Sequence, residues 1–128
     1  MKIAIVQIQS VKGDVAHNLV HHQKMVDAAV AHGATAVNFP ELSLTGYEPT
    51  LAKTLATSLD DPRFEVFQTV SDVQQVTIGV GMPTHSPDGV CISMILFRPQ
   101  RPREIYSKKY LHVDEEPFFV SGRNFPIL

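Results

Sequence analysis

Residues 34–49 read ATAVNFPELSLTGYEP, an apolar run followed by a polar run of turn-forming residues. The segment from Ala34 to Phe39 is apolar and predicts a strand, which Pro40 ends because proline has no backbone N–H to donate. The polar, turn-forming residues from Ser43 to Thr50 predict a loop. Glu41 therefore follows the strand directly, at the edge of the sheet where α/β folds place their functional residues.

The sequence before this stretch predicts a helix and another strand. Apolar residues recur at helical spacing from Asn18 to His32, and Gly33 is a typical helix stop. Lys2 to Gln9 is rich in Ile and Val, as a buried strand is. The order strand, helix, strand with short links predicts that the two strands run parallel.

A second helix is predicted after the loop. Asp61 is suited to cap it, and Pro62 is favoured at its first position because the proline N–H would be unpaired there in any case. The predicted apolar face of this helix consists of Phe64, Phe67, Val70 and Val73. No regular element is predicted after Lys108.

Three more strands complete the predicted sheet: Val76–Met82, Cys91–Phe97 and the short Glu104–Ser107. The turn-forming residues from Ser86 to Gly89 join the first two as a hairpin. The order of elements predicts an α/β fold with a mixed sheet and helices over one or both faces. The chain stops at residues 126–128 without a closing element, so we expect it to be part of a larger domain.

Composition excludes several classes of function. The 128 residues are 44% hydrophobic and 19% charged, which is typical of globular proteins. A net charge of −2 offers no general attraction to nucleic acid or anionic lipid, so we expect neither partner. We also expect no signal peptide and no membrane span, because the apolar runs are short or interrupted. The single cysteine excludes an internal disulfide and favours the cytoplasm.

Three segments could supply chemistry. Glu41 lies at a strand end, although a carboxylate after proline is also a common loop residue. Lys108 and Lys109 follow the last strand, from which an ammonium group could stabilise an oxyanion; a solvated pair is the simpler interpretation. The acidic residues 114–116 have the same ambiguity, because acidic runs are usually exposed to water.

Two other groups are better explained by structure than by chemistry. Cys91 lies within an apolar strand, where a small buried side chain is expected. His17 and His21 have the four-residue spacing of some metal sites, with His22 beside them, but the sequence offers no third ligand at useful spacing. We therefore expect no metal and interpret the histidines as a solvated helix face.

Taken together, four segments resemble the nitrilase superfamily of carbon–nitrogen hydrolases. The opening IAIVQ at residues 3–7 is similar to the first strand of that family. PELSLTGYEP at residues 40–49 resembles its segment around the catalytic glutamate, and YSKKYL at residues 106–111 its lysine segment. DEEPFFVSG at residues 114–122 resembles the stretch that follows the lysine.

The resemblance implies a fold and a set of roles. The fold would be an αββα sandwich, with a mixed sheet carrying helices on its outer face, and residues 1–128 would be the N-terminal part of one domain. A cysteine thiolate would attack the C–N carbon of a small amide, carbamoyl amide or nitrile without a metal or cofactor. Glu41 would be the general base and Lys108 would hold the oxyanion. A supporting glutamate would be Glu116, with Glu115 as the neighbouring possibility.

The sequence also departs from the family. The family nucleophile lies in a segment beyond the lysine, which these residues do not reach, so we expect the chain to be inert alone. Ser107 and Tyr110 replace an arginine and a histidine that are frequent in the family. A non-catalytic ligand-binding or protein-interaction module is the alternative. Half of a sandwich would leave apolar surface uncovered, so we expect self-association, in the form of a homo-oligomer or an aggregate.

Overall fold

The computed structural model describes residues 1–124 and contains one five-stranded sheet with helices. The strands are β1 (Ile3–Ile5), β2 (Ala36–Asn38), β3 (Thr77–Ser86), β4 (Gly89–Phe97) and β5 (Glu104–Ser107). The helices are α1 (Val15–Ala31), α2 (Pro49–Leu55), the 3-10 turn η1 (Pro62–Phe64) and α3 (Glu65–Gln74). This arrangement confirms the predicted α/β class with a mixed sheet. The prediction made from residues 126–128 lies outside the described residues.

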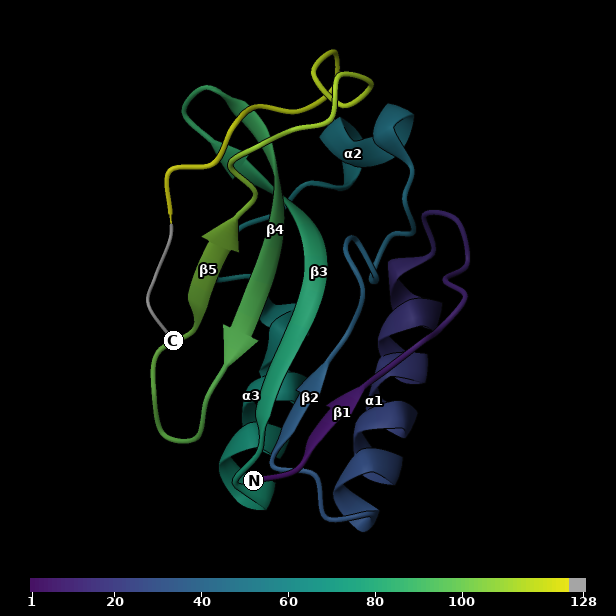
Figure 1. Ribbon diagram of the computed structural model, residues 1–128, viewed down its shortest axis with the longest axis vertical. Helices are drawn as coiled ribbons and strands as arrows, with labels where there is room; N and C mark the ends of the chain where they lie inside the picture. Colours follow the sequence, from purple (N-terminus) through teal and green to yellow (C-terminus); the bar gives the residue numbers. More distant parts are fainter. Residues whose placement is uncertain (125–128) are drawn as a thin grey trace.

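The strands follow one another across the sheet in sequence order (Figure 1). β1, β2 and β3 are parallel, as the strand–helix–strand order predicts, and β4 and β5 are antiparallel additions. β3 and β4 form a hairpin whose pairing extends to Ser86 and Gly89, so both strands are longer than predicted. β1 is shorter than the predicted Lys2–Gln9, because its partner β2 has only three residues.

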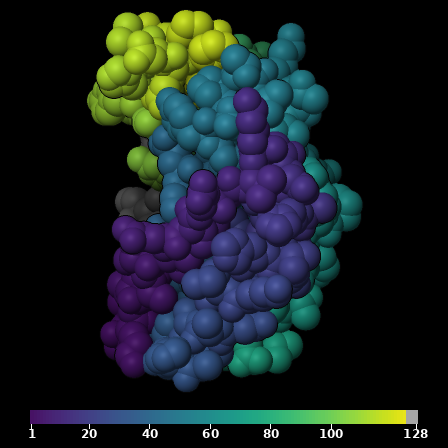
Figure 2. All heavy atoms as spheres, turned by 90° about the vertical axis from the view of Figure 1, so that its right-hand side faces the viewer, coloured from purple at the N-terminus to yellow at the C-terminus, as the bar shows by residue number. Residues whose placement is uncertain are grey.

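Helix α1 begins three residues earlier than predicted because of its cap. The side chain of Asp14 accepts a hydrogen bond from the backbone N–H of His17 and so satisfies a free donor of the first turn. The helix packs on one face of the sheet and buries Asn18, His22 and Val26. Figure 2 views the molecule from the side of this helix and shows that it lies in the middle of that surface, beside the N-terminal residues.

The second predicted helix begins where expected but buries a narrower face. Asp61 caps it, and Pro62 starts the 3-10 turn that leads into α3. Phe64 and Phe67 are buried, as predicted, whereas Val73 is 71% exposed, so that prediction is wrong. Each step of three residues falls about 60° short of a full turn, so three steps carry Val73 roughly to the opposite side from Phe64.

Helix α2 overlaps the end of the predicted loop and continues through residues 51–55, where no regular element was predicted. It has seven residues, starts with Pro49 and buries Ala52 against the protein. No side chain caps its first turn, so it lacks the N-cap signal that Asp61 provides for the next helix. In both Figure 1 and Figure 2 it lies at one end of the molecule, beside the C-terminal segment.

The two faces of the sheet differ. Helices α1 and α3 cover one face (Figure 1). Phe39, Phe67 and Phe97 are fully buried in the core on that face. On the other face Ile3 and Ile5 are 56% and 73% exposed, because they alternate with the core residue Ala4. The described helices lack the length and apolar character needed to cross a membrane.

Candidate active site

Glu41 and Lys108 meet on the open face of the sheet. Glu41 stands in the turn that follows β2, and Lys108 directly follows β5. Lys108 Nζ lies 3.0 Å from Glu41 Oε1, although the two residues are 67 positions apart in the chain. The structure therefore brings together the two side chains that the sequence singled out from separate strand ends.

The turn that carries Glu41 is pressed against strand β3 at Gly81. The backbone N–H of Leu44 donates to the Gly81 carbonyl at 3.0 Å. A Cβ atom at residue 81 would overlap the Pro40 carbonyl oxygen and the backbone nitrogens of Leu42 and Ser43, so glycine is required there. Leu42 has a φ of 52°, a conformation that bulky residues rarely adopt. The close approach fixes the backbone on either side of Glu41.

The backbone of Lys108 is held on both sides. Its N–H donates to the Ile92 carbonyl at 2.8 Å, and its carbonyl accepts from the N–H of Gly122 at 2.8 Å. These bonds continue the β4–β5 pairing past the end of the strand and attach the C-terminal segment to it. The Lys108 side chain is then free to extend toward Glu41 with about one-third of its surface exposed.

Glu115, and not Glu116, is the second carboxylate beside Lys108. Glu115 Oε1 lies 3.1 Å from Lys108 Nζ, and the side chain is 3% exposed. Glu116 is exposed and lines a different hollow, together with Lys53 and Phe118. The expectation that Glu116 is placed at the site is therefore wrong, and the alternative Glu115 has that position.

The buried Phe119 explains this choice. It lies four residues after Glu115 in a stretch of turns, and its N–H donates to the Glu115 carbonyl at 2.9 Å. Residues at this spacing project to the same side of a helical turn, so burying Phe119 turns Glu115 inward and Glu116 outward. The sequence contains two adjacent aromatic residues here, and only the structure shows that Phe119 is buried while Phe118 is exposed.

Tyr47 is a further member of the cluster. It belongs to the segment that carries the family resemblance, but the sequence gave it no role. Its hydroxyl donates to Glu115 Oε2 at 2.8 Å, while the backbone N–H of His112 donates to Glu115 Oε1 at 2.8 Å. Both oxygens of Glu115 are thus occupied by donors from three segments of the chain. Bonding to a carboxylate raises the pKa of the Tyr47 hydroxyl.

The cluster favours opposite charges on its members. Burial by itself lowers the pKa of Lys108, but hydrogen bonds to Glu41 and Glu115 outweigh it, so the pKa lies above the ordinary value. Burial likewise raises the pKa of Glu115, but donation from the His112 N–H, Tyr47 and Lys108 outweighs it, so that pKa is lowered. Lys108 is therefore an ammonium and Glu115 a carboxylate at neutral pH.

A hollow of about 200 Å³ lies beside the ion pair. Its lining consists of Glu41, Gly81, Ile92, Ser93, Met94, Tyr106 and Lys108. The carboxylate can accept a proton and the ammonium can stabilise a developing negative charge, while the remaining surface is largely apolar. The arrangement suits general base and oxyanion chemistry on a small molecule.

Cys91 does not line this hollow. It is 4% exposed and pairs with Thr84 across the β3–β4 hairpin, as expected for a small buried side chain in a strand. A separate hollow of about 230 Å³ touches it, together with His85 and Ser121. The protein's single thiol is thus buried in the sheet and outside the Glu41–Lys108 hollow.

The histidines of α1 do not share one environment. His17 is exposed and His21 half-buried, whereas His22 is fully buried and stacks on Phe39. The interpretation of all three as a solvated face is therefore wrong for His22. Within residues 1–124 no three His, Cys, Asp or Glu side chains come together as a possible metal site.

Comparisons with known proteins show the family and the fold. The family model of carbon-nitrogen hydrolases matches residues 2–128. The chain belongs to the carbon–nitrogen hydrolase family. No curated protein sequence matches it. This family membership confirms the resemblance seen in the sequence.

Solved structures share the fold of this carbon–nitrogen hydrolase chain. An amidase from Nesterenkonia sp. AN1 is 23% identical with a TM-score of 0.82, over 97% of this chain and 50% of its own length. XC1258 from Xanthomonas campestris, a CN-hydrolase superfamily protein with an arsenic adduct in its active site, is 20% identical with a TM-score of 0.83. That match covers 95% of this chain and 46% of XC1258. The chain thus spans about half the length of these proteins.

Mutants of the Nesterenkonia amidase locate a reactive thiol in that protein. One carries the acetamide moiety of fluoroacetamide, and another an acrylamide adduct, at the active-site cysteine. In a third mutant the amidase is in complex with butyramide.

Proposed function

We propose that this chain supplies the general base and the oxyanion-stabilising lysine of an enzyme that hydrolyses C–N bonds in small molecules. The substrate class would be non-peptide amides, carbamoyl amides or nitriles. The observation that carries the proposal is the Glu41–Lys108–Glu115 cluster, with its 3.0 Å and 3.1 Å contacts at the edge of an apolar hollow. Membership of the carbon–nitrogen hydrolase family supports the same reaction class.

The proposed mechanism gives each member of the cluster a separate task. Glu41, whose side chain is 41% exposed, accepts the proton of an attacking thiol and later that of the hydrolytic water. The ammonium of Lys108 stabilises the negative charge that develops on the substrate oxygen or nitrogen. Glu115 is buried, and its oxygens are occupied by Tyr47 and the His112 N–H, so it holds Lys108 in place.

The thiol of this reaction would come from outside the 128 residues. Cys91 is the chain's single cysteine and is buried away from the Glu41–Lys108 hollow. We propose that residues 1–128 are the N-terminal part of a single domain, in keeping with their match to about half of the Nesterenkonia amidase. Loss of a nucleophile lowers turnover on the order of a million-fold in a well-studied hydrolase, so the chain alone would be inert.

The alternative is a ligand-binding or protein-interaction module derived from this fold. The position of Cys91 favours it, because the hollow keeps the base and the cation without a thiol beside them. The hydrolase and the module differ in whether an attacking thiol is supplied to the Glu41–Lys108 hollow.

Ammonia release from a panel of amides, N-carbamoyl compounds and nitriles distinguishes the hydrolase from the non-catalytic module. The 128-residue chain is assayed beside the product of any reading frame that continues past residue 128. We expect the short chain to be inactive and the longer product to be active. Glu41→Gln and Lys108→Met should each abolish that activity, whereas Cys91→Ala should not change it. Turnover by the short chain that disappears in Cys91→Ala would instead make Cys91 the nucleophile.

We further propose a cytoplasmic location and self-association through the open sheet face. The single cysteine supports the first, and the exposed Ile3, Ile5 and Tyr106 support the second. Sedimentation of the purified chain at micromolar concentration tests the association, which a well-folded monomer would disprove.

A further inference from the structure

A chain of buried hydrogen bonds connects helix α1 to the turn that carries Glu41. His22 is fully buried, and its Nδ1 lies 2.6 Å from the carbonyl oxygen of Asn18. A carbonyl only accepts hydrogen bonds, so Nδ1 must carry the proton of the neutral ring. His22 Nε2 is then an acceptor, and the Ser43 hydroxyl, 2.8 Å away, must donate to it.

The same hydroxyl holds strand β3. Ser43 Oγ accepts the backbone N–H of Gly81 at 3.0 Å. The direction of donation is therefore fixed along the whole chain, from the Gly81 N–H to Ser43 Oγ and from the Ser43 hydroxyl to His22 Nε2. Every group in it is buried, so a missing member would leave its neighbour without a partner.

This chain meets the Glu41 turn at its closest point to the sheet. Ser43 lies two residues after Glu41, and the next residue, Leu44, returns to pair with the Gly81 carbonyl at 3.0 Å. The His22 ring is itself held by Phe39, which precedes the turn, with ring centroids 4.1 Å apart. His22 thus contacts the chain on both sides of the Pro40–Glu41 step.

We propose that His22 and Ser43 are positioning residues that hold Glu41 in place against Lys108. The significance of that placement rests on the function proposed above. Ser43 fixes the turn to Gly81, and the unprotonated Nε2 of His22 fixes the orientation of the Ser43 hydroxyl. Burial first of all lowers the pKa of His22 to about 4, so the ring is neutral, as this role requires, at physiological pH.

Ser43→Ala, His22→Leu and the double variant test the proposal in the chain as it stands. Amide exchange of Gly81 reports the hydrogen bond itself, and NMR titration of the Lys108 side chain reports its contact with Glu41. We expect Ser43→Ala to speed Gly81 exchange about tenfold, as loss of one hydrogen bond predicts, and to shift the Lys108 pKa toward the ordinary lysine value. His22→Leu should cause the same two changes, and the double variant should add little to either single one.

Two further variants separate positioning from general damage. Ser71, in helix α3, is also fully buried, but its hydroxyl has no hydrogen-bond partner. Ser71→Ala should therefore change neither readout. His22→Gln can offer an amide oxygen to Ser43 and should restore part of what His22→Leu loses. Urea unfolding of each variant establishes that it is folded under the conditions used.

The result that overturns the proposal is a Lys108 titration that stays unchanged in Ser43→Ala while Gly81 exchange accelerates. Additive effects of Ser43→Ala and His22→Leu would also overturn it, because the two residues would then act separately. The experiment measures no turnover. A chain that hydrolyses no amide at all therefore leaves this test intact, and failure of the test leaves the hydrolase proposal intact.

Discussion

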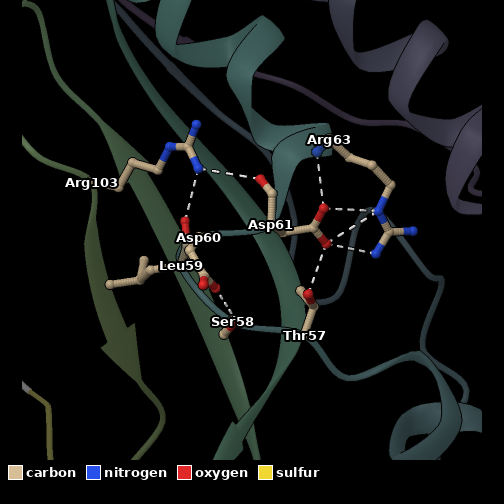
Figure 3. A network of polar contacts seen from close by, with 7 residues as sticks. All are labelled: Thr57, Ser58, Leu59, Asp60, Asp61, Arg63 and Arg103. Carbon is tan, nitrogen blue, oxygen red and sulfur yellow. Dashed lines mark hydrogen bonds and ion pairs between the residues drawn. The ribbon is translucent and has the colours of Figure 1, made fainter.

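Two clusters of carboxylates and cations in this molecule are built in opposite ways. Asp61 bonds to residues within four positions of it in the sequence: Thr57 donates to it at 2.7 Å, and Arg63 donates through its backbone at 2.9 Å and its guanidinium at 2.7 Å (Figure 3). Glu41 instead meets Lys108, which lies 67 positions away. The first cluster is local and the second is assembled by the fold.

The clusters also differ in how fully their oxygens are used. The Asp61 side chain is 5% exposed, and donors occupy both of its oxygens. The hydrogen bonds from Arg63 are the largest cause that lowers the pKa of Asp61 to about 2. Arg103, which directly precedes β5, donates to the Asp61 carbonyl at 3.2 Å and so joins this cap to the sheet (Figure 3). Such a carboxylate has no capacity left for a substrate.

The Glu41 side chain is 41% exposed and lines a hollow, so it retains the capacity to accept a proton from another molecule. Asp61, saturated by local donors, is thus suited to stabilise structure, whereas Glu41, placed by long-range packing and left partly open, is suited to chemistry. Variants and pH titration can measure this difference.

The largest change in stability should come from lowering the pH, because of the buried His22. Burial lowers the pKa of His22 from 6.5 to about 4, so the unfolded chain binds its proton first as the pH falls. The stability linked to His22 is complete above pH 6.5 and is lost as the pH falls toward 4, by about 3 kcal/mol. Urea unfolding between pH 7 and 4 checks this. His22→Leu should lack the loss, and an equal loss in that variant would contradict the assignment.

Asp61→Asn should be the most damaging change to either cluster. The pKa of Asp61 is lowered from 3.8 to about 2, so its charged form stabilises the fold above pH 3.8 and that stability is lost as the pH falls toward 2. The free energy of unfolding of the variant should be about 2 kcal/mol lower than that of the wild type at pH 7. Asp60→Asn is the matched control, because Asp60 is exposed. Equal losses in the two variants would remove the distinction between the local cap and its surroundings.

Lys108→Met should cost about 1 kcal/mol, because Glu115 keeps its bonds from Tyr47 and the His112 N–H after the cation is lost. The pKa of Glu115, which is lowered in the wild type, should rise. The difference in unfolding free energy between Lys108→Met and wild type should therefore shrink as the pH falls below the ordinary glutamate range, because Glu115 then becomes protonated in both proteins. Carbon NMR of the Glu115 carboxyl group measures the shift directly. An unchanged pKa would show that Lys108 does not hold this carboxylate.

Glu41→Gln should have the smallest effect on stability, within about 0.5 kcal/mol of wild type, because exposed ion pairs contribute little. The same change should abolish the turnover that is proposed above for a longer product. Thermal or urea unfolding provides the measurement, and a loss as large as that of Asp61→Asn would place Glu41 with the structural cluster. A small stability change with a large loss of activity is the outcome that separates the two clusters.

Much of the fold was predictable because its signals are local. The cap at Asp61 and Pro62 acts within two residues, and the turn at Ser86–Gly89 joins neighbouring strands. Helix α2 has no comparable cap and was missed. Val73 was assigned to the wrong face because a spacing of three was extended beyond the range in which it follows one side of a helix.

The candidate site was predictable only in part. The sequence identified Glu41 and Lys108 from their strand ends and from the resemblance to the carbon–nitrogen hydrolases. It did not decide between Glu115 and Glu116, because adjacent residues in an irregular segment have no fixed facing. Phe119 packs in a cluster with Leu42 and Ile92, which come from distant parts of the chain, and this packing turns Glu115 toward Lys108.

Short-range patterns and motifs were therefore enough to predict the order of the five strands and of helices α1 and α3, the family, and the two residues of the ion pair. The tertiary structure alone decided which carboxylate joins Lys108, that Tyr47 bonds to it, and that His22 is buried beneath the Glu41 turn. These contacts join residues 7 to 68 positions apart. Side chains at such separations meet only where packing of the whole sheet places them, and no local preference specifies that placement.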